Sequence, residues 1–170
     1  FKNYFLWINE NNKNKSTYAK NNRFTGYWQD VDIFYKNKDF ILKSISKNKT
    51  INKILTQEKA KGSTALHIRR KDYITLGEDL SIDFFINSIK YCEKNIVNFN
   101  YEIFSDDYEW VKKQSVFKNA NKIHKFIDSK EETLKSFAKL LVCENFIVGN
   151  SSFSLTAALL GSTEKSKILI

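Results

Sequence analysis

Short apolar runs alternate with amphipathic stretches along residues 63–170 of this 170-residue chain. The runs have the length of β-strands, and the stretches between them repeat apolar side chains at three- and four-residue steps, as helices that bury one face do. Such alternation is typical of a parallel sheet covered by helices. The strands are expected at residues 64–68, 101–105, 122–127, 145–148 and 167–170. The pattern therefore predicts an α/β domain over residues 63–170.

The expected helices have recognisable ends. They lie at residues 30–45, 81–97, 107–114 and 152–160, and after Ser129. Ser129 and Glu132 have the spacing of a capping box, in which each side chain satisfies a backbone N–H of the first turn. The buried stripe of this helix is expected to be Leu134, Phe137, Ala138 and Leu141. Gly161 follows the last expected helix and predicts its end, because glycine commonly stops a helix.

The first third of the chain is less regular. Residues 1–23 show little periodicity and include a polar Lys/Asn run. The helix at residues 30–45 is expected to turn three side chains inward, Phe34, Ile41 and Ile45. We therefore expect residues 1–62 to be an incomplete, mainly helical N-terminal or linker region. The first residue is not Met and the last four residues begin an apolar run, so both ends are predicted to be cut.

Composition indicates a folded protein of one ordinary domain. Apolar residues make up 42% of the chain and aromatic residues 15%, well above the content of disordered chains. The sequence has neither a long apolar run nor a signal peptide, which predicts a soluble, cytoplasmic protein and leaves peripheral membrane contact open. Cys92 and Cys143 fall in helical patterns, so both are expected to be buried, reduced thiols.

The net charge of +9 arises from 28 Lys and Arg against 19 Asp and Glu. Such an excess is compatible with a nucleic acid, an anionic membrane or a phosphorylated substrate, and a general Lys/Asn bias explains it equally well. A nucleic-acid-binding module is one alternative, because Phe and Tyr are interleaved with the lysines. The sequence contains no zinc-finger or helix-turn-helix motif that would favour this alternative.

The first candidate site segment follows the strand at residues 64–68. It contains His67, Arg69, Arg70 and Asp72. In an open α/β sheet, ligands bind at the carboxyl ends of the strands. The planar fork of Arg donors matches phosphate oxygens, so the Arg pair suits a diphosphate leaving group. The alternative is a solvated Arg–Asp ion pair of the kind common on surfaces.

Two further segments follow later strands. Asp106 and Asp107 come after residues 101–105, where carboxylates could accept hydrogen bonds from a base or a ribose, or could cap the next helix. A small polar loop precedes the helix at residues 152–160 and contains Asn150, Ser151, Ser152 and Phe153. Its backbone N–H groups could bind an anion, although simple capping is the alternative. No His, Cys or Asp cluster has metal-ligand spacing, so no metal and no cofactor are predicted.

Taken together, the segments resemble a known family. "HIRRKDY", "YEIFSDDYEW" and "NFIVGNSSFSLTAALLG", in this order and spacing, are similar to three motif regions of the alpha-1,2-fucosyltransferases of glycosyltransferase family 11. Residues 26–29, followed by Phe34, resemble a further stretch, so the resemblance covers about residues 24–170. The pattern His-x-Arg-Arg-x-Asp is shared with alpha-1,6- and protein O-fucosyltransferases and therefore specifies the donor better than the linkage. The linkage rests on the Ser-Ser-Phe-Ser segment.

The resemblance implies a GT-B enzyme of two facing Rossmann-like domains, whose C-terminal domain corresponds to residues 63–170 and holds GDP-fucose. It also implies roles for the site residues. Arg69 binds the β-phosphate and neutralises departing GDP, while Arg70 supports the site and His67 lies against the nucleotide. Asp72 orients Arg or His or acts near the sugar, and Asp106 or Asp107 holds guanine. Asn150, Ser151, Ser152 and Phe153 belong to the nucleotide pocket.

The implied reaction moves L-fucose to a galactoside hydroxyl in alpha-1,2 linkage, with inversion and without metal. The expected partners are GDP-fucose and a galactose-terminated glycan rather than nucleic acid. Lys71 stands where the family usually has Gly, Leu155 and Thr156 stand where it has two tryptophans, and a Gly-Gly-Leu-Gly-Asn-Gln-like segment is absent. A non-catalytic or different-donor sugar-nucleotide-binding domain is therefore the second alternative.

Overall fold

The computed structural model describes residues 5–9, 21–25, 31–57, 62–127 and 129–170. The chain divides into two compact units, residues 1–33 and residues 34–170. In the first unit, β1 (Phe5–Asn9) pairs in parallel with β2 (Asn21–Thr25), although no strand was predicted there. Two isolated five-residue strands are too short to produce a visible period. The motif-like residues 26–29 lie outside the described residues.

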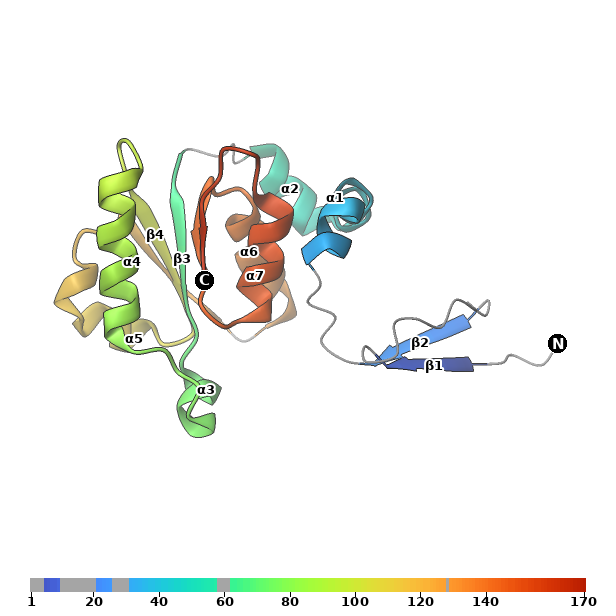
Figure 1. Cartoon of the computed structure of the whole chain (residues 1–170), viewed down its shortest axis with the longest axis horizontal. Coiled ribbons are helices and arrows are strands. Elements are labelled where there is room, and N and C mark those ends of the chain that lie inside the picture. The colour runs from blue at the N-terminus through green and yellow to red at the C-terminus, as the bar shows by residue number, and fades with distance from the viewer. Residues whose placement is uncertain (1–4, 10–20, 26–30, 58–61, 128) are drawn as a thin grey trace. The chain divides into compact units, whose positions relative to one another are not determined.

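The second unit is built on a five-stranded parallel sheet with the order β5-β4-β3-β6-β7 (Figure 1). The strands are β3 (Thr64–Ile68), β4 (Tyr101–Ser105), β5 (Lys122–Lys125), β6 (Asn145–Ile147) and β7 (Ile168–Leu169). In the central register, Thr64 lies opposite Tyr101 on one side and Asn145 on the other. The predicted α/β, Rossmann-like sheet is confirmed, although β5 and β7 are shorter than predicted.

The helices lie on both faces of the sheet. They are α1 (Val31–Ile45), α2 (Lys49–Gln57), α3 (Lys71–Leu76), α4 (Ile82–Asn95), α5 (Tyr108–Lys113), α6 (Lys130–Leu141) and α7 (Ser152–Gly161). Two of the predicted N-caps are present. The Ser129 hydroxyl accepts the N–H of Glu132 at 3.2 Å, and the Asp107 carboxylate accepts the N–H of Trp110 at 3.1 Å. These bonds satisfy donors that a helix start leaves without an intrahelical partner.

The side chains of β3 alternate between the two faces of the sheet, and the core is therefore divided into two layers. Leu66 and Ile68 pack with buried residues of α4 and α5, whereas Ala65 packs with residues of α6 and α7. Successive side chains of a strand point to opposite faces, so His67 shares the second face with Ala65. Figure 1 shows α4 and α5 on one side of the sheet and α6 and α7 on the other. Burial on both faces explains why β3 reads as an almost continuous apolar run.

Sequence patterns missed two helices. The six-residue α3 follows β3 directly and buries no side chain, so it has no apolar stripe to detect. The nine-residue α2 buries only Ile51 and Ile54, which pack against Ala138 of α6. Residues 49–57 therefore pack on α6 in a small cluster of their own, and a domain boundary at residue 62 stays a prediction for the whole protein.

Both cysteines are buried and neither forms a disulfide, as predicted. Burial raises the pKa of Cys92 to about 11, so its thiol is protonated at neutral pH. Across the described residues, no helix combines the length and the apolar character needed to cross a membrane.

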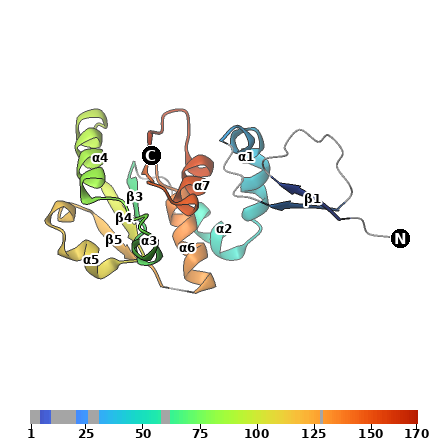
Figure 2. The same cartoon turned by 60° about the horizontal axis from the view of Figure 1, so that its bottom comes forward.

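α7 ends at Gly161, one residue later than predicted. The helix continues through Gly161 and its C-cap is Ser162, whose backbone is extended. A Cβ on Gly161 would lie only 2.4 Å from the carbonyl oxygen of Leu141, at the end of α6. Figure 2 shows α6 and α7 side by side. Glycine is therefore needed here for the close approach of two helix backbones.

The contact predicts that Gly161→Ala destabilises the protein. Alanine is the better helix former, but a Cβ facing a backbone carbonyl cannot be accommodated by a side-chain rotation. The free energy of unfolding should fall by about 1–3 kcal/mol, as for other overpacked sites. Ser152→Ala, at an exposed position of the same helix, should change it by less than about 0.5 kcal/mol. Urea titration of both variants measures the difference, and equal stability of the two would contradict the packing argument.

Candidate functional site

A cavity of about 410 Å³ opens at the carboxyl ends of β3 and β4 and the N-terminal ends of α6 and α7. The chain runs from β3 outward through β4 to β5 and then returns to β6 on the other side of β3. The cavity therefore lies at the topological switch point, where open α/β sheets bind ligands. Its lining is His67, Arg69, Asp72, Tyr73, Phe104, Ser105, Asp106, His124, Phe126, Thr133, Ser136, Ser151, Ser152 and Phe153.

Arg69 extends from the end of β3 into this lining. Its Nη2 donates to Oδ2 of Asp72 at 3.0 Å, and its Nε lies 2.8 Å from Oδ1 of the same carboxylate. Nη1 lies 3.3 Å from Oδ2 of Asp106. A guanidinium has five N–H donors, and these contacts use at most three of them. Arg69 therefore keeps donors for a ligand while two carboxylates fix its position.

The pKa values follow from these pairs. Burial alone would lower the pKa of Arg69, but the hydrogen bond to Asp72 and the charges of Asp106 and Asp72 raise it overall. The same hydrogen bond from Arg69 lowers the pKa of Asp72. Both groups are therefore charged at neutral pH, and Asp72 is a weaker base than an isolated carboxylate.

His67 lies at the base of the cavity beside Phe153, with ring centroids 5.8 Å apart. Its side chain is buried, with 8% of its surface exposed, and Nδ1 has no hydrogen-bond partner within the described part of the chain. Burial and then the charge of Arg69 lower the pKa of His67 to about 4. The imidazole is therefore neutral at pH 7, and one of its polar atoms is left for a ligand or a water.

Asp106 organises the turn that carries Arg69. Its Oδ1 accepts the backbone N–H of Arg70 at 2.9 Å, and its Oδ2 accepts that of Lys71 at 3.3 Å. The side chain is only 4% exposed. The carboxylate thus serves as the N-terminal anion of α3, which begins at Lys71 and has no side-chain cap of its own. Lys71 takes part through its backbone N–H.

Three of the predicted site residues lie outside the lining of the cavity. Arg70 contacts Asp79 and Asp107 through its guanidinium, at 3.2 and 3.3 Å. Asp107 caps α5 through its other carboxylate oxygen. The side-chain amide of Asn150 donates to the carbonyl of Glu78 at 2.8 Å. The other seven predicted residues, from His67 to Phe153, line the cavity together.

The N-terminus of α7 supplies a second polar wall. Ser151 is its N-cap residue, but the Ser151 side chain makes no capping hydrogen bond. The nearby Ser154 hydroxyl donates to the carbonyls of Val148 and Ser151, so it does not cap the first N–H groups of the helix either. Ser152 and Phe153 therefore begin the helix beside the cavity with N–H groups that the Ser151 side chain does not cap. Such a helix start binds anions through these donors and the helix dipole.

Seven lining residues were not predicted as site residues: Tyr73, Phe104, Ser105, His124, Phe126, Thr133 and Ser136. Phe104 and His124 are stacked, with ring centroids 4.3 Å apart and planes at 8°. His124 also pairs through Nε2 with Oε2 of Glu102, at 2.5 Å. Burial lowers the pKa of His124 despite this pair. The strand that carries His124 was predicted, and its carboxyl end was the signal that could have pointed to this edge of the site.

Within the described ranges, no group of three His, Cys, Asp or Glu side chains is arranged to hold a metal ion. The positive charge at the cavity is instead that of Arg69.

Comparison with known proteins places this geometry in a family. The family model of Glycosyl transferase family 11 matches residues 1–170. An alpha-1,2-colitosyltransferase of Escherichia coli is 30% identical over 142 residues, which are 77% of this chain and 48% of that protein. The O-antigen biosynthesis glycosyltransferase WbnK of Escherichia coli is 29% identical over 162 residues, 85% of this chain and 52% of that protein.

A crystal structure of POFUT1 in complex with GDP aligns with a TM-score of 0.49 and 15% identity, over 74% of this chain and 46% of that chain. The chain spans about half the length of the curated relatives it matches. The family match extends over every residue, and it confirms the family predicted from the three motif regions. The chain belongs to glycosyl transferase family 11.

Proposed function

We propose that this chain is the donor-binding part of a two-domain GT-B glycosyltransferase that moves L-fucose from GDP-fucose to a galactoside hydroxyl in alpha-1,2 linkage. The observation that carries the proposal is the convergence of two anion-binding elements on one cavity. The Arg69 guanidinium and the N-terminus of α7 both line it, at the switch point of the sheet. A diphosphate is the ligand that this pair of elements suits.

Arg69 is proposed to bind the β-phosphate with the N–H groups that its carboxylate contacts leave over. Asp72 holds the guanidinium along one edge, so Arg69 loses little side-chain freedom when the ligand arrives. We therefore assign Asp72 to the orientation of Arg69 rather than to proton abstraction, in keeping with its lowered pKa.

The base is proposed to lie toward Phe104, His124 and Phe126, which give the cavity an aromatic end. Neutral His67 would contact the nucleotide between this end and Arg69. Asp106 was a sequence-based candidate for guanine, but its oxygens already accept two backbone N–H groups. We propose that Asp106 supports the Arg69 turn and that guanine is read by other groups.

The proposed reaction is a single displacement with inversion. The acceptor hydroxyl attacks the anomeric carbon on the face opposite the leaving group and gives up its proton to a base or to water, while the bond from that carbon to the β-phosphate oxygen breaks. The departing GDP takes the electron pair, and Arg69 and the α7 N-terminus stabilise the negative charge that develops there. The positive charge of Arg69 takes the place that a divalent metal has in other transferases.

A different 6-deoxy-type donor sugar is the second candidate. It is favoured by the 30% identity to a relative named for colitose, a sugar other than fucose. Leu155 and Thr156, in place of two tryptophans, lie on α7 two and three residues after the lining residue Phe153. The phosphate and base contacts proposed above are the same for both donors.

The first test concerns Arg69. Arg69→Lys keeps a positive charge but removes the planar fork, so GDP affinity should fall by at least about tenfold, or roughly 1.4 kcal/mol. Calorimetric titration with GDP measures this change. Lys94→Ala, at an exposed position of α4, serves as the control and should bind GDP normally. Unchanged affinity in folded Arg69→Lys would remove the phosphate role.

A second test separates the donor classes and the nucleic-acid alternative. GDP, GDP-fucose and GDP-colitose should raise the melting temperature in proportion to their affinities, whereas UDP-galactose should have little effect. Stabilisation by GDP-colitose well above that by GDP-fucose would favour the second candidate. A mixed oligonucleotide that binds with a steep salt dependence, in a protein indifferent to GDP, would instead support a nucleic-acid-binding module.

A third test concerns metal. If Arg69 supplies the stabilising charge, EDTA should leave the rate of transfer unchanged in the full-length protein. The measurement is release of GDP with a galactoside acceptor, before and after chelation. Loss of activity that Mn²⁺ or Mg²⁺ restores would contradict the proposed charge compensation.

A further inference from the structure

A short segment lies between the two anion-binding elements without lining the cavity. This bridging segment consists of Glu78, Asp79 and Leu80, in the turn between α3 and α4. Asp79 Oδ2 lies 3.2 Å from Nη1 of Arg70, the residue next to Arg69. The carbonyl of Glu78 accepts the side-chain N–H of Asn150, the residue before Ser151, at 2.8 Å. One segment therefore contacts the neighbours of both elements.

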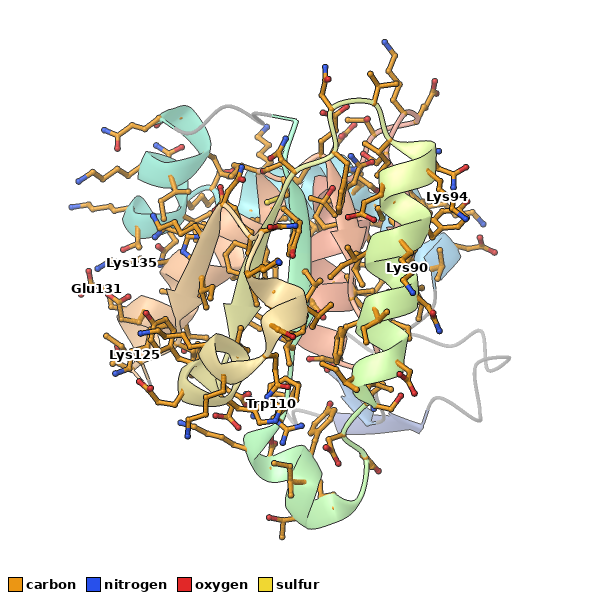
Figure 3. All side chains as sticks on the ribbon, turned by 90° about the vertical axis from the view of Figure 1, so that its left-hand side faces the viewer. Lys90, Lys94, Trp110, Lys125, Glu131 and Lys135 are labelled. Atoms are coloured by element: carbon orange, nitrogen blue, oxygen red, sulfur yellow. The ribbon has the colours of Figure 1, made fainter. Side chains whose placement is uncertain are left out.

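Through Asp79, the segment contacts an immobilised arginine. The Arg70 guanidinium lies over the Trp110 ring, 3.8 Å from its centroid, and only 15% of the side chain is exposed. Asp107 holds Nε of Arg70 at 3.3 Å, and Asp79 completes the pairing at Nη1. Figure 3 shows Trp110 on α5, near the start of α3. The stacking on Trp110 and the contacts with two carboxylates together hold the guanidinium in one position.

Through Leu80, the segment packs against a glycine. Gly149 has a φ of +55°, and a Cβ there would lie 2.6 Å from Cδ1 of Leu80. Leu80 itself packs against the core layer formed by β3, β4 and α4. The loop that leads into α7 is therefore seated on Leu80, with the Asn150 hydrogen bond beside it. Movement of the segment would shift this loop.

We infer that the bridging segment sets the spacing between Arg69 and the N-terminus of α7, with Asp79 and Asn150 as positioning residues for the diphosphate. The inference rests on the proposed function, since it needs a ligand that spans both elements. Asn150, a sequence-based candidate for donor contact, acts here through Glu78 and the α7 start.

Substitution of Asp79 or Asn150 should change GDP affinity more than it changes the free energy of unfolding. Asp79 and Asn150 are exposed residues, and exposed ion pairs and hydrogen bonds contribute little to the free energy of unfolding. The affinity for a diphosphate that contacts both elements depends more strongly on their spacing. A small displacement of either element weakens both contacts at once. The β-phosphate contact with Arg69 should suffer most, so GDP should lose more affinity than GMP.

The test uses Asp79→Asn and Asn150→Asp in the full-length protein. Asp83→Asn and Asn87→Asp make the same chemical changes at exposed positions of α4 and serve as matched controls. GDP and GMP affinities are measured by calorimetry, and stability by urea titration. We expect GDP affinity to fall by about fivefold or more in both variants, GMP affinity to change by less than about twofold, and the controls to match wild type. The double variant should lose little more than the stronger single variant, because both act through one segment.

Asp79→Glu keeps the carboxylate and should retain most of the GDP affinity, which also covers the case in which Asp79→Asn fails to fold. Wild-type GDP affinity in both single variants would overturn the inference and leave the proposed function intact. Parallel losses for GDP and GMP, accompanied by lower stability, would show a purely structural role and also overturn it. A wild-type protein that binds neither nucleotide would refute the proposed function itself, and the inference with it.

Discussion

The buried carboxylate of Asp106 is the interaction on which the geometry of the site depends. It comes from the end of β4 but holds the turn at the end of β3, through two backbone N–H groups and the charge of Arg69. A charge that is 96% removed from solvent is costly unless hydrogen bonds and an opposite charge compensate it, and here both are present. The carboxylate therefore stabilises the turn, and the N–H groups of the turn compensate the buried charge. The direction in which Arg69 leaves the sheet follows from this mutual stabilisation.

Parts of the fold whose residues are buried on both sides could be predicted closely from sequence. β3 and β4 were found with their observed bounds, because central parallel strands give apolar runs that local pattern detects. α2, α3 and the β1–β2 pair were missed, since each has too few buried side chains or too few residues to produce a period. The role of Gly161 depends on a neighbouring helix backbone, which no local pattern contains.

In the candidate site, too, local sequence predicted some features, while others depend on tertiary contacts. Residues at strand ends, such as His67 and Arg69, could be placed together because parallel strands end at one edge. The motif alone could not show which of these residues face the cavity, since Arg70 and Asn150 have polar side chains like those of the lining residues but contact other parts of the protein. The Glu102–His124 pair was missed because its members are adjacent only through strand pairing. The sequence motifs thus located the site at one edge of the sheet, while the contacts of each side chain show which residues line the cavity.

The edge of the sheet at β5 has a consequence for behaviour at high concentration. Among the strands that the structure describes, β5 pairs with β4 alone, so its outer N–H and C=O groups face away from the sheet. A strand edge of this kind can pair with another chain and start association. In this protein the strand is four residues long, and an exposed lysine stands at each of its ends, Lys122 and Lys125. Two copies brought edge to edge would set these ammonium groups against each other, so the same lysines that raise the net charge also disfavour intermolecular sheet growth.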